Sequence, residues 1–322
     1  MKKIFKRLIT SGSVLVGTGI TIEAINLITN KLATAHELLA SSTENAQTYH
    51  WKLADIHYSK SGKGTPLLLV HELAPSSSSY EWSRVIPALA RKHTVYAIDL
   101  PGCGLSEKLD ITYTNLFYVQ LLNDFVKNVI GDATTVIATG LSASFAVLAC
   151  NYEPEQYRKV ILVNPSSLTE LSRTPSTRSK IRRSLFKIPL IGTLLYNMLL
   201  SKKTLQREFE ERMFFDIKEL PLNALNAYYE SAHLGNSKGK YLLSSILGNY
   251  LYFNISNSLK EIDNDIIIVG GEYQEYIEDT MAGYVNENFS IETCTVDNTC
   301  HLPQFENPEG FLRQISVYLF FV

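Results

Sequence analysis

The strongest constraint on the fold of this chain is an alternation of short apolar runs with longer amphipathic stretches after residue 45. A run that is apolar on both sides suits a central strand of a parallel sheet, and the stretches between such runs suit helical crossovers. The predicted strands are residues 67–70, 94–99, 134–139, 160–164 and 266–269. The predicted helices are residues 80–91, 113–129, 144–151 and 308–321, and residues 51–59 are expected to form an antiparallel edge arm. The pattern predicts the α/β class, with a mostly parallel central sheet flanked by helices.

The alternation stops between residues 166 and 259, where the pattern is helical and no strong strand is predicted. We expect this segment to be a helical cap inserted into a core made of residues 45–165 and 260–322. From Arg173 to Lys203 the segment carries eight Lys and Arg residues and no acid. Apolar side chains recur there on one helical face: Ile191, Leu194, Leu195, Met198 and Leu199. Either this stripe packs on the core below a solvated basic face, or the cap rests on anionic lipid or admits an apolar, acidic substrate.

Residues 1–40 form a separate N-terminal segment. Lys2, Lys3, Lys6 and Arg7 precede an uncharged run over residues 8–22, which is the arrangement of an export or anchoring signal. Three interpretations stay open: an uncleaved membrane anchor, a signal cleaved near residues 33–35, or a soluble helix. As an anchor, the segment predicts a membrane-associated protein whose main domain is extracytoplasmic, and as a soluble helix it predicts a cytoplasmic one.

The composition excludes several classes of protein. The 322 residues are 45% hydrophobic and 19% charged, which is enough apolar material for a globular core. The net charge of −2 gives no general case for nucleic acid as a partner. No two of the four cysteines form the close pair typical of zinc or redox sites, so no metal is expected; a bridge between Cys294 and Cys300 stays open if the domain is exported.

A short motif between a predicted strand and a predicted helix carries the chemistry. Residues 140–144 read G-L-S-A-S, and G-x-S-x-G in this context is a nucleophile elbow, which needs small residues around the serine. The motif therefore predicts Ser142 as a nucleophile at a helix N-terminus, with the Ala143 N–H donating to an oxyanion. The loop that begins at His71 could supply a second donor, most plausibly the Leu73 N–H.

Two further motifs accompany the elbow. Residues 99–106 read D-L-P-G-C-G-L-S after a predicted strand, and Cys300-His301-Leu302-Pro303 precedes the last predicted helix. Together these motifs resemble those of the α/β-hydrolases, the family that includes esterases and lipases, over roughly residues 50–322. The resemblance implies an α/β-hydrolase fold with a helical cap and no cofactor. It implies Ser142 as the nucleophile and His301 as the base.

The chain departs from the family pattern in three places. Glu72 follows the loop histidine where the family has glycine, and Ser144 replaces the second glycine of the elbow. Gln274 stands where the family has its aspartate, and an amide cannot act as the carboxylate that orients the histidine. Either Glu275 turns toward His301, or the enzyme is slow, or it is inactive; Glu272 is a weaker candidate for the acid.

The sequence therefore predicts a serine hydrolase that cleaves an ester or related acyl bond of a hydrophobic small molecule or lipid-like substrate, with a membrane surface as a further partner. Ser142 would attack, His301 would transfer the proton with Glu275 as the acid that orients it, and the Leu73 and Ala143 amides would hold the oxyanion. One alternative is a carbon-carbon bond hydrolase or a peptidase of the same fold. Another is a non-catalytic ligand-binding or membrane-anchored interaction protein on the same scaffold.

Overall fold

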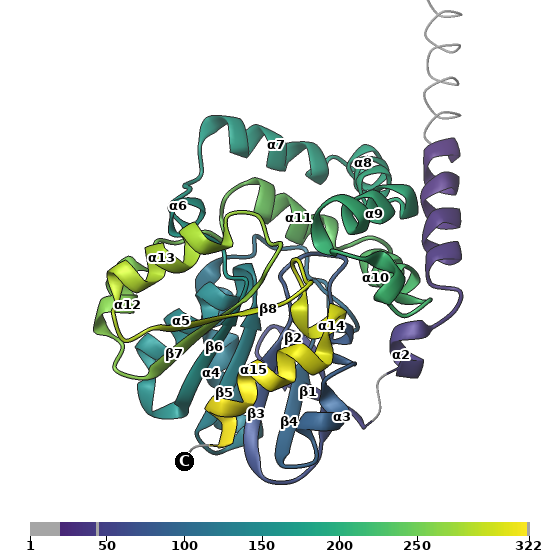
Figure 1. The fold of residues 1–322 in the computed structure, drawn as a ribbon. Coiled ribbons are helices and arrows are strands. Elements are labelled where there is room, and N and C mark those ends of the chain that lie inside the picture. The colour runs from purple at the N-terminus through teal and green to yellow at the C-terminus, as the bar shows by residue number, and fades with distance from the viewer. Residues whose placement is uncertain (1–19, 43–44, 321–322) are drawn as a thin grey trace, which may run out of the picture.

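A single eight-stranded sheet organises the molecule (Figure 1). The computed structural model describes residues 20–42 and 45–320. The strands are β1 (Ala46–Trp51), β2 (Ala54–Ser61), β3 (Thr65–Val70), β4 (His93–Ile98), β5 (Thr134–Thr139), β6 (Tyr157–Val163), β7 (Asp265–Gly271) and β8 (Glu292–Val296). Their order is β1-β2-β4-β3-β5-β6-β7-β8; β2 pairs antiparallel with β1 and β4, and the other pairs are parallel. The predicted α/β class with a mostly parallel sheet is confirmed.

The sheet is covered by helices on both faces because its central strands are apolar on both sides. Leu68 and Val70 of β3 belong to the cluster on one face, and Leu67 and Leu69 belong to the cluster on the other face. The helices that flank the sheet are α3 (Ile86–Leu89), α4 (Asn115–Phe125), α5 (Leu141–Tyr152), α13 (Ile277–Glu287), α14 (Pro303–Glu306) and α15 (Pro308–Phe320). Short turns of 3-10 or π type complete this part: η1 (Ser79–Trp82), η2 (Val126–Ile130) and η3 (Pro154–Gln156).

The predicted elements are found with shifted ends. Each of the five predicted strands overlaps an observed one, and the predicted helix at residues 80–91 is split into η1 and α3. The predicted edge arm at residues 51–59 crosses the turn between β1 and β2, because the antiparallel hairpin starts earlier than expected. Its β1 strand is exposed over most of its length, so its sequence lacks the apolar alternation that marks a half-buried strand.

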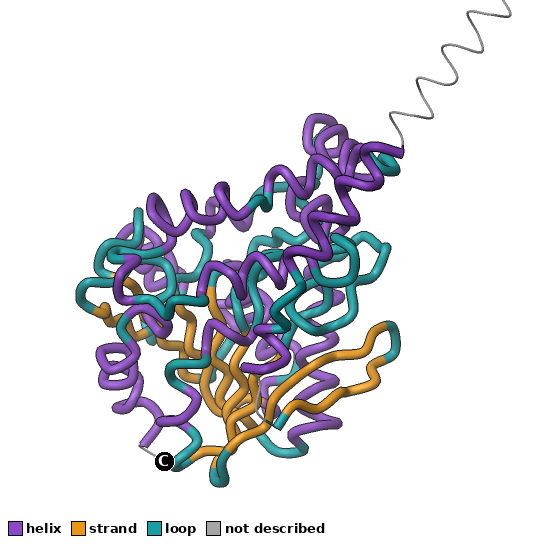
Figure 2. The backbone as a smooth tube through the Cα atoms, turned by 90° about the vertical axis from the view of Figure 1, so that its right-hand side faces the viewer, coloured by secondary structure: helices purple, strands orange, loops and turns teal. Residues whose placement is uncertain are grey.

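Helices alone occupy the chain between β6 and β7 in the part that the structure describes. They are α6 (Leu168–Leu171), α7 (Thr177–Lys187), α8 (Ile191–Leu199), α9 (Lys202–Glu208), η4 (Phe209–Met213), η5 (Ile217–Glu219), α10 (Ala224–His233), α11 (Lys240–Leu247) and α12 (Ser256–Glu261). Figure 2 shows most of these helices above the strands. We call residues 166–259 the helical insert.

The chain before the sheet lies against the helical insert. Residues 20–33 are helical, α2 (Leu38–Ser42) follows, and the Leu38 N–H donates to Glu230 of α10 at 2.7 Å. The basic residues 2–7 and most of the uncharged run at 8–22 lie outside the described residues. Within residues 20–42 and 45–320, we find no helix with both the length and the hydropathy that a membrane crossing requires.

All four cysteines are free, so the Cys294 to Cys300 bridge that the sequence left open is not formed. Cys294 lies in β8, whereas Cys300 lies beyond that strand with its thiol directed to the Arg212 carbonyl at 3.1 Å.

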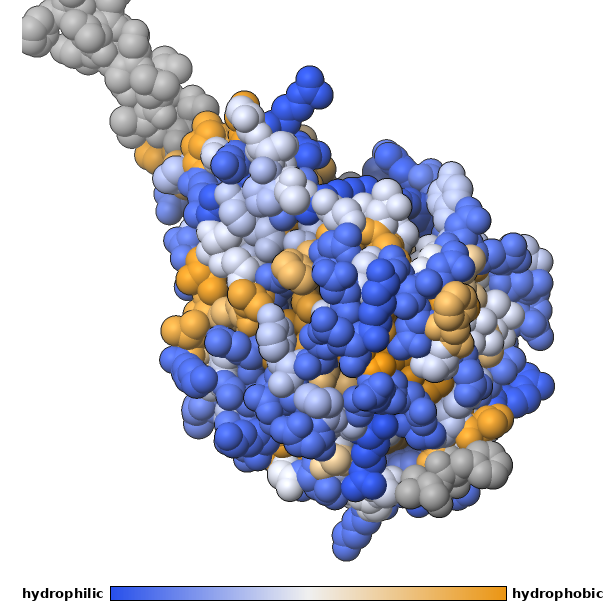
Figure 3. Space-filling view, turned by 90° about the vertical axis from the view of Figure 1, so that its left-hand side faces the viewer, coloured by the Kyte–Doolittle hydropathy of each residue, from blue (hydrophilic) through white to orange (hydrophobic). Residues whose placement is uncertain are grey.

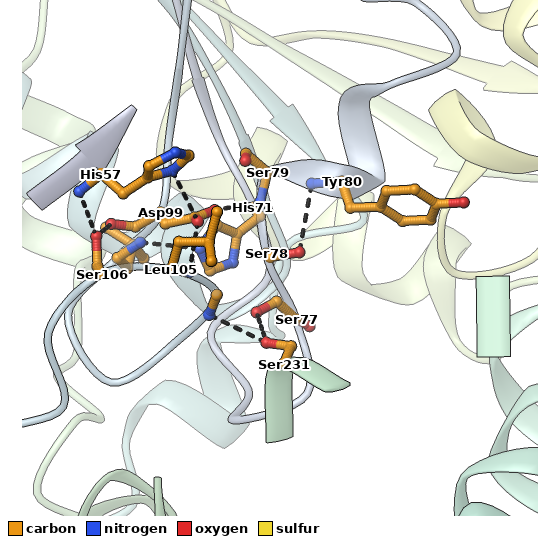
Figure 4. Close-up of polar contacts among 12 residues, drawn as sticks. His57, His71, Ser77, Ser78, Ser79, Tyr80, Asp99, Leu105, Ser106 and Ser231 are labelled. Carbon is orange, nitrogen blue, oxygen red and sulfur yellow. Dashed lines mark hydrogen bonds and ion pairs between the residues drawn. The ribbon is translucent and has the colours of Figure 1, made fainter. Parts of the chain in front are cut away.

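The buried Asp99 carboxylate joins the loops that follow β3 and β4 (Figure 4). One oxygen accepts the Ser79 N–H at 2.7 Å, and the other accepts the Leu105 N–H at 2.8 Å and faces His57 Nδ1 at 3.2 Å. Burial opposes ionisation, but the hydrogen bonds to the carboxylate and its electrostatic interaction with His57 outweigh it and hold the pKa of Asp99 well below its usual range. This charge fixes the loop that begins at His71.

We expect Asp99→Asn to lower the free energy of unfolding by about 2–4 kcal/mol, because the amide leaves the buried N–H groups and His57 without their charged acceptor. Urea unfolding of the full chain measures this loss. Asp55→Asn is the matched control, because the Asp55–His50 pair is exposed and should contribute little. An equal effect of the two substitutions would contradict this role of Asp99.

Candidate active site

The turn between β5 and α5 is made by Gly140. Its backbone angles are φ 58° and ψ −124°, a region that side chains with a Cβ rarely adopt. In a nucleophile elbow this strained position belongs to the nucleophile itself, which the turn presents at the top of the sheet. The residue presented here is a glycine. The elbow therefore carries no side chain at the position where the family places its nucleophile.

The structure does not place Ser142 at the turn, where the sequence predicted a nucleophile. Ser142 lies two residues past the turn, in the first turn of α5, and its side chain is completely buried. Its hydroxyl has no hydrogen-bond partner within the described residues, and it does not line the pocket that contains Gly140 and His301. The G-x-S-x-S pattern contains several small residues, among them Gly140 and Ser142. By itself it does not show which of these two makes the turn and which packs behind it.

The carboxylate of Glu72 occupies the oxyanion hole. Glu72 Oε1 accepts the N–H of Leu73 at 2.8 Å and the N–H of Leu141 at 3.2 Å. These two donors come from the loop after β3 and from the residue after the elbow, which are the positions that build this hole in an α/β-hydrolase. Leu73 thus lies where the sequence predicted it. Ala143 does not, because its N–H donates to the Gly140 carbonyl at 3.2 Å.

The second oxygen of Glu72 takes the place of the missing nucleophile. A Cβ added to Gly140 would lie 1.3 Å from Glu72 Oε2, so the glycine leaves the space that the carboxylate fills. The same oxygen lies 3.2 Å from Nε2 of His301. The structure therefore brings His301 to the elbow as predicted, but its partner there is a carboxylate from the loop after β3.

The other face of His301 meets an amide. His301 Nδ1 lies 3.3 Å from Oε1 of Gln274, and Glu275 makes no contact with the imidazole among the described residues. Glu275 is exposed and hydrogen-bonds the Tyr276 hydroxyl instead, and Glu272 accepts the Asn298 N–H. The predicted role of Glu275 is therefore not supported by its position. Both ring nitrogens of His301 thus face oxygen atoms that can accept a hydrogen bond.

A second buried glutamate supports the first. Glu81 is fully buried on η1, and its Oε2 accepts the Glu72 N–H at 3.0 Å. Burial raises the pKa of Glu81 to about 8, so its carboxyl group stays protonated at neutral pH. The sequence gives no sign of this residue, since an acid nine positions after Glu72 in a predicted helix belongs to no motif.

The elbow opens into a polar pocket of about 480 Å³ between the sheet and the helical insert. Its wall carries more acidic than basic groups: Glu72, Glu170, Glu208, Glu211 and Glu275 against Arg173, Arg212 and His301. The pocket favours neutral or cationic ligands over anionic ones.

Comparison with known proteins agrees with this architecture. Residues 65–308 match the family model for the alpha/beta hydrolase fold. The chain belongs to the α/β-hydrolase fold family. It is 24% identical over 274 residues to a proline iminopeptidase of Heyndrickxia coagulans, covering 81% of this chain and 93% of the relative.

Solved structures of other α/β-hydrolases share the fold at low identity. The epoxide hydrolase CorEH is 20% identical with a TM-score of 0.69, over 85% of this chain and 98% of that one. A membrane phospholipase A is 17% identical with a TM-score of 0.68, over 99% of this chain and 98% of that one. These likenesses establish the fold, and the reactive groups must be inferred from this chain's own site.

We expect a fluorophosphonate probe to leave the wild-type α/β-hydrolase chain unlabelled, because no hydroxyl stands at the elbow. The variant Gly140→Ser with Glu72→Gly should be labelled at position 140, since it places a hydroxyl beside His301 and empties the oxyanion hole. Mass spectrometry of the labelled peptide gives the position. Adding Ser142→Ala should not change that labelling, and labelling of Ser142 in the wild type would contradict the assignment of the elbow.

We expect Glu81→Gln to stabilise the protein more at pH 8 than at pH 5. The folded pKa of about 8 lies above the ordinary 4.5, so wild-type stability falls as the pH rises between these values. Glutamine keeps an acceptor for the Glu72 N–H and does not titrate. The difference in melting temperature, variant minus wild type, should be about 5 °C larger at pH 8 than at pH 5. The same difference at both pH values would contradict a neutral, buried Glu81.

Proposed function

We propose that this chain is a small-molecule hydrolase that works without a serine nucleophile, with the Glu72 carboxylate and the His301 imidazole as its reactive groups. One observation carries the proposal: Glu72 lies with one oxygen in the oxyanion hole and the other in the nucleophile's place, 3.2 Å from His301 Nε2. A carboxylate held in this way can act as a nucleophile, and the adjacent imidazole can supply and recover a proton.

The proposed reaction has two steps. Glu72 Oε2 attacks an electrophilic carbon, the carbon–oxygen bond breaks, and the imidazolium of His301 gives its Nε2 proton to the departing oxygen. The product of this step is an ester whose carbonyl oxygen is Glu72 Oε1. His301 then takes a proton from water, which attacks the ester carbon, and the Leu73 and Leu141 N–H groups stabilise the oxyanion. Collapse of the intermediate breaks the ester bond to the oxygen that carries the substrate, and the leaving alkoxide takes the proton of the new carboxylic acid. An alcohol is released, and the carboxylate and the imidazolium are restored.

This chemistry selects the substrate class. Attack of a carboxylate on a carbonyl carbon would give an anhydride, whereas attack on a saturated carbon gives an ester that water can hydrolyse. An epoxide provides such a saturated carbon, and its leaving oxygen stays attached to the molecule. That oxygen needs one proton, which His301 would supply. We infer that the substrate is an epoxide carried by a neutral or cationic polar molecule, because acidic side chains exceed basic ones in the pocket wall.

The ester, peptide and carbon-carbon cleavages considered from the sequence require the serine mechanism. Ser142 is buried away from the pocket and Gly140 has no side chain, so these reactions lose their nucleophile. A hydrophobic, lipid-like substrate is also disfavoured, because the pocket wall is rich in charged residues.

A second candidate function is ligand binding without catalysis. The position of Gln274 favours ligand binding without catalysis. An amide lies beside Nδ1 of His301 in place of the carboxylate that orients a catalytic histidine, so among the described residues Glu72 supplies the carboxylate that contacts this ring. In that case the Glu72–His301 pair would close the oxyanion hole, and the pocket would only bind its ligand.

Turnover in oxygen-18 water tests the proposal. With glycidol and styrene oxide as probes, we expect diol formation by the full chain and a fall of at least about 100-fold in Glu72→Gln. Because water attacks the ester carbon, oxygen-18 should appear in the wild-type peptide that contains Glu72. Glu275→Gln is the matched control: it removes a carboxylate of the same pocket that does not contact His301, and it should change kcat by less than about twofold.

Three other outcomes would overturn all or part of the proposal. Diol formation without label in Glu72 would exclude the ester and leave the pair acting on water directly. Saturable binding without turnover would favour the second candidate. Ester hydrolysis by the wild type that disappears in Ser142→Ala would restore the serine mechanism.

We also propose that the full chain associates with a membrane through its first residues, with the main domain outside the cytoplasm. The support is the sequence: four cations in residues 1–7 followed by an uncharged run to residue 22. A cytoplasmic protein with a soluble N-terminal helix is the alternative.

A further inference from the structure

The helix over residues 20–33 buries two polar side chains and exposes most of its apolar ones, together with Glu23 and Lys31. Its buried side includes Asn26 and Asn30. The Asn26 side chain donates to the Leu190 carbonyl at 3.2 Å and accepts from the Asn197 amide at 3.0 Å, while Asn30 accepts from Ser237. The apolar side chains Ile20, Ile25, Leu27, Ile28 and Leu32 are exposed. A helix that buries amides and exposes its apolar side chains suits a medium that is not water.

Helix α7 exposes an apolar stripe as well. Ile181 and Leu185 are 60% and 44% exposed, while Phe186 faces the protein on the opposite side. At 100° per residue, Arg178 and Arg182 fall on one flank of the stripe, and Lys180 and Lys187 fall on the other. Apolar side chains between two rows of cations are typical of a helix that lies in the plane of a bilayer surface, with the long cations reaching the headgroups.

Helix α8 connects these two elements. Asn197 of α8 and Leu190, just before it, bind Asn26, and α7 packs on α8. Ile191, Met198 and Leu199 of α8 are exposed. These residues belong to the apolar stripe for which the sequence allowed either packing on the core or contact with lipid. Figure 3 shows hydrophobic side chains gathered where the described chain begins. We call the exposed side chains of residues 20–33, α7 and α8 the insert face.

We propose that the insert face lies on an anionic lipid bilayer. The proposal rests on the proposed membrane association and names the surface that carries it. Charge favours a bilayer over a second copy of this chain as the partner of the insert face. Residues 173–203 carry eight cations and no acid, so a second copy of the same face would bring like charges together. A bilayer with anionic headgroups neutralises these cations and covers the apolar stripe. The uncharged run at residues 8–22 leads directly into the helix of this face.

Tryptophan fluorescence in the full chain tests this surface. Leu185→Trp places a probe in the stripe of α7, and Phe289→Trp places the control at a position that is 85% exposed between α13 and β8. With vesicles of phosphatidylcholine and phosphatidylglycerol that carry brominated acyl chains, we expect the Leu185→Trp signal to fall about twofold or more and the control signal to stay. The wild type, with Trp51 and Trp82 buried, gives the background.

Flotation of the same samples separates the two proposals. Flotation together with quenching supports both the membrane association and the insert face. In that case the double variant Ile181→Glu, Leu185→Glu should bind vesicles about tenfold or more weakly than the wild type, and 0.5 M salt should weaken binding to the same extent. Flotation without quenching at position 185 would keep the membrane association and overturn the insert face. Absence of flotation would overturn both. A dimer in light scattering whose formation the two glutamates abolish would assign the face to a second copy.

Discussion

The site depends on one electrostatic constraint: two convergent N–H groups at the elbow need a negative partner, and Glu72 supplies it from within the chain. The Leu73 donor comes from the loop after β3, and the Leu141 donor is the first residue of α5, where the helix dipole also favours negative charge. Gly140 makes the arrangement possible, because any side chain there would collide with the carboxylate. The His301 ring completes the site, with Nε2 at 3.2 Å from the other oxygen of Glu72.

Two other buried acids hold the loop that carries Glu72, and they do so in opposite protonation states. Asp99 is surrounded by N–H donors and His57, so it stays ionised. Glu81 lacks a cationic partner, so burial keeps it protonated while it accepts the Glu72 N–H. The neutral His71 ring lies between them, accepting the Leu100 N–H and donating to the Glu72 carbonyl. The position of the Glu72 carboxylate thus rests on a network built largely from one loop.

The helical insert connects the pocket with the exterior. Its α6 and η4 residues form part of the pocket wall, while α7 and α8 expose apolar side chains beside the N-terminal helix. Buried amides join the N-terminal helix to the insert. A surface that contacts lipid would therefore be part of the same structural unit that covers the reactive groups.

The sheet, its flanking helices and the meeting of the loops at its edge can be predicted from the residues alone, because apolar periodicity and chain order are local properties. The sequence also placed His301 and Leu73 in the site, and it marked Glu72 and Gln274 as unusual. The residue at the elbow turn becomes clear only in the fold. The G-x-S-x-S pattern allows either Gly140 or Ser142 at the turn, and the strained backbone of Gly140 identifies it as the turn residue. The fold alone showed Glu72 in the oxyanion hole, since side chains 229 positions apart meet only when β3 and β8 belong to one sheet.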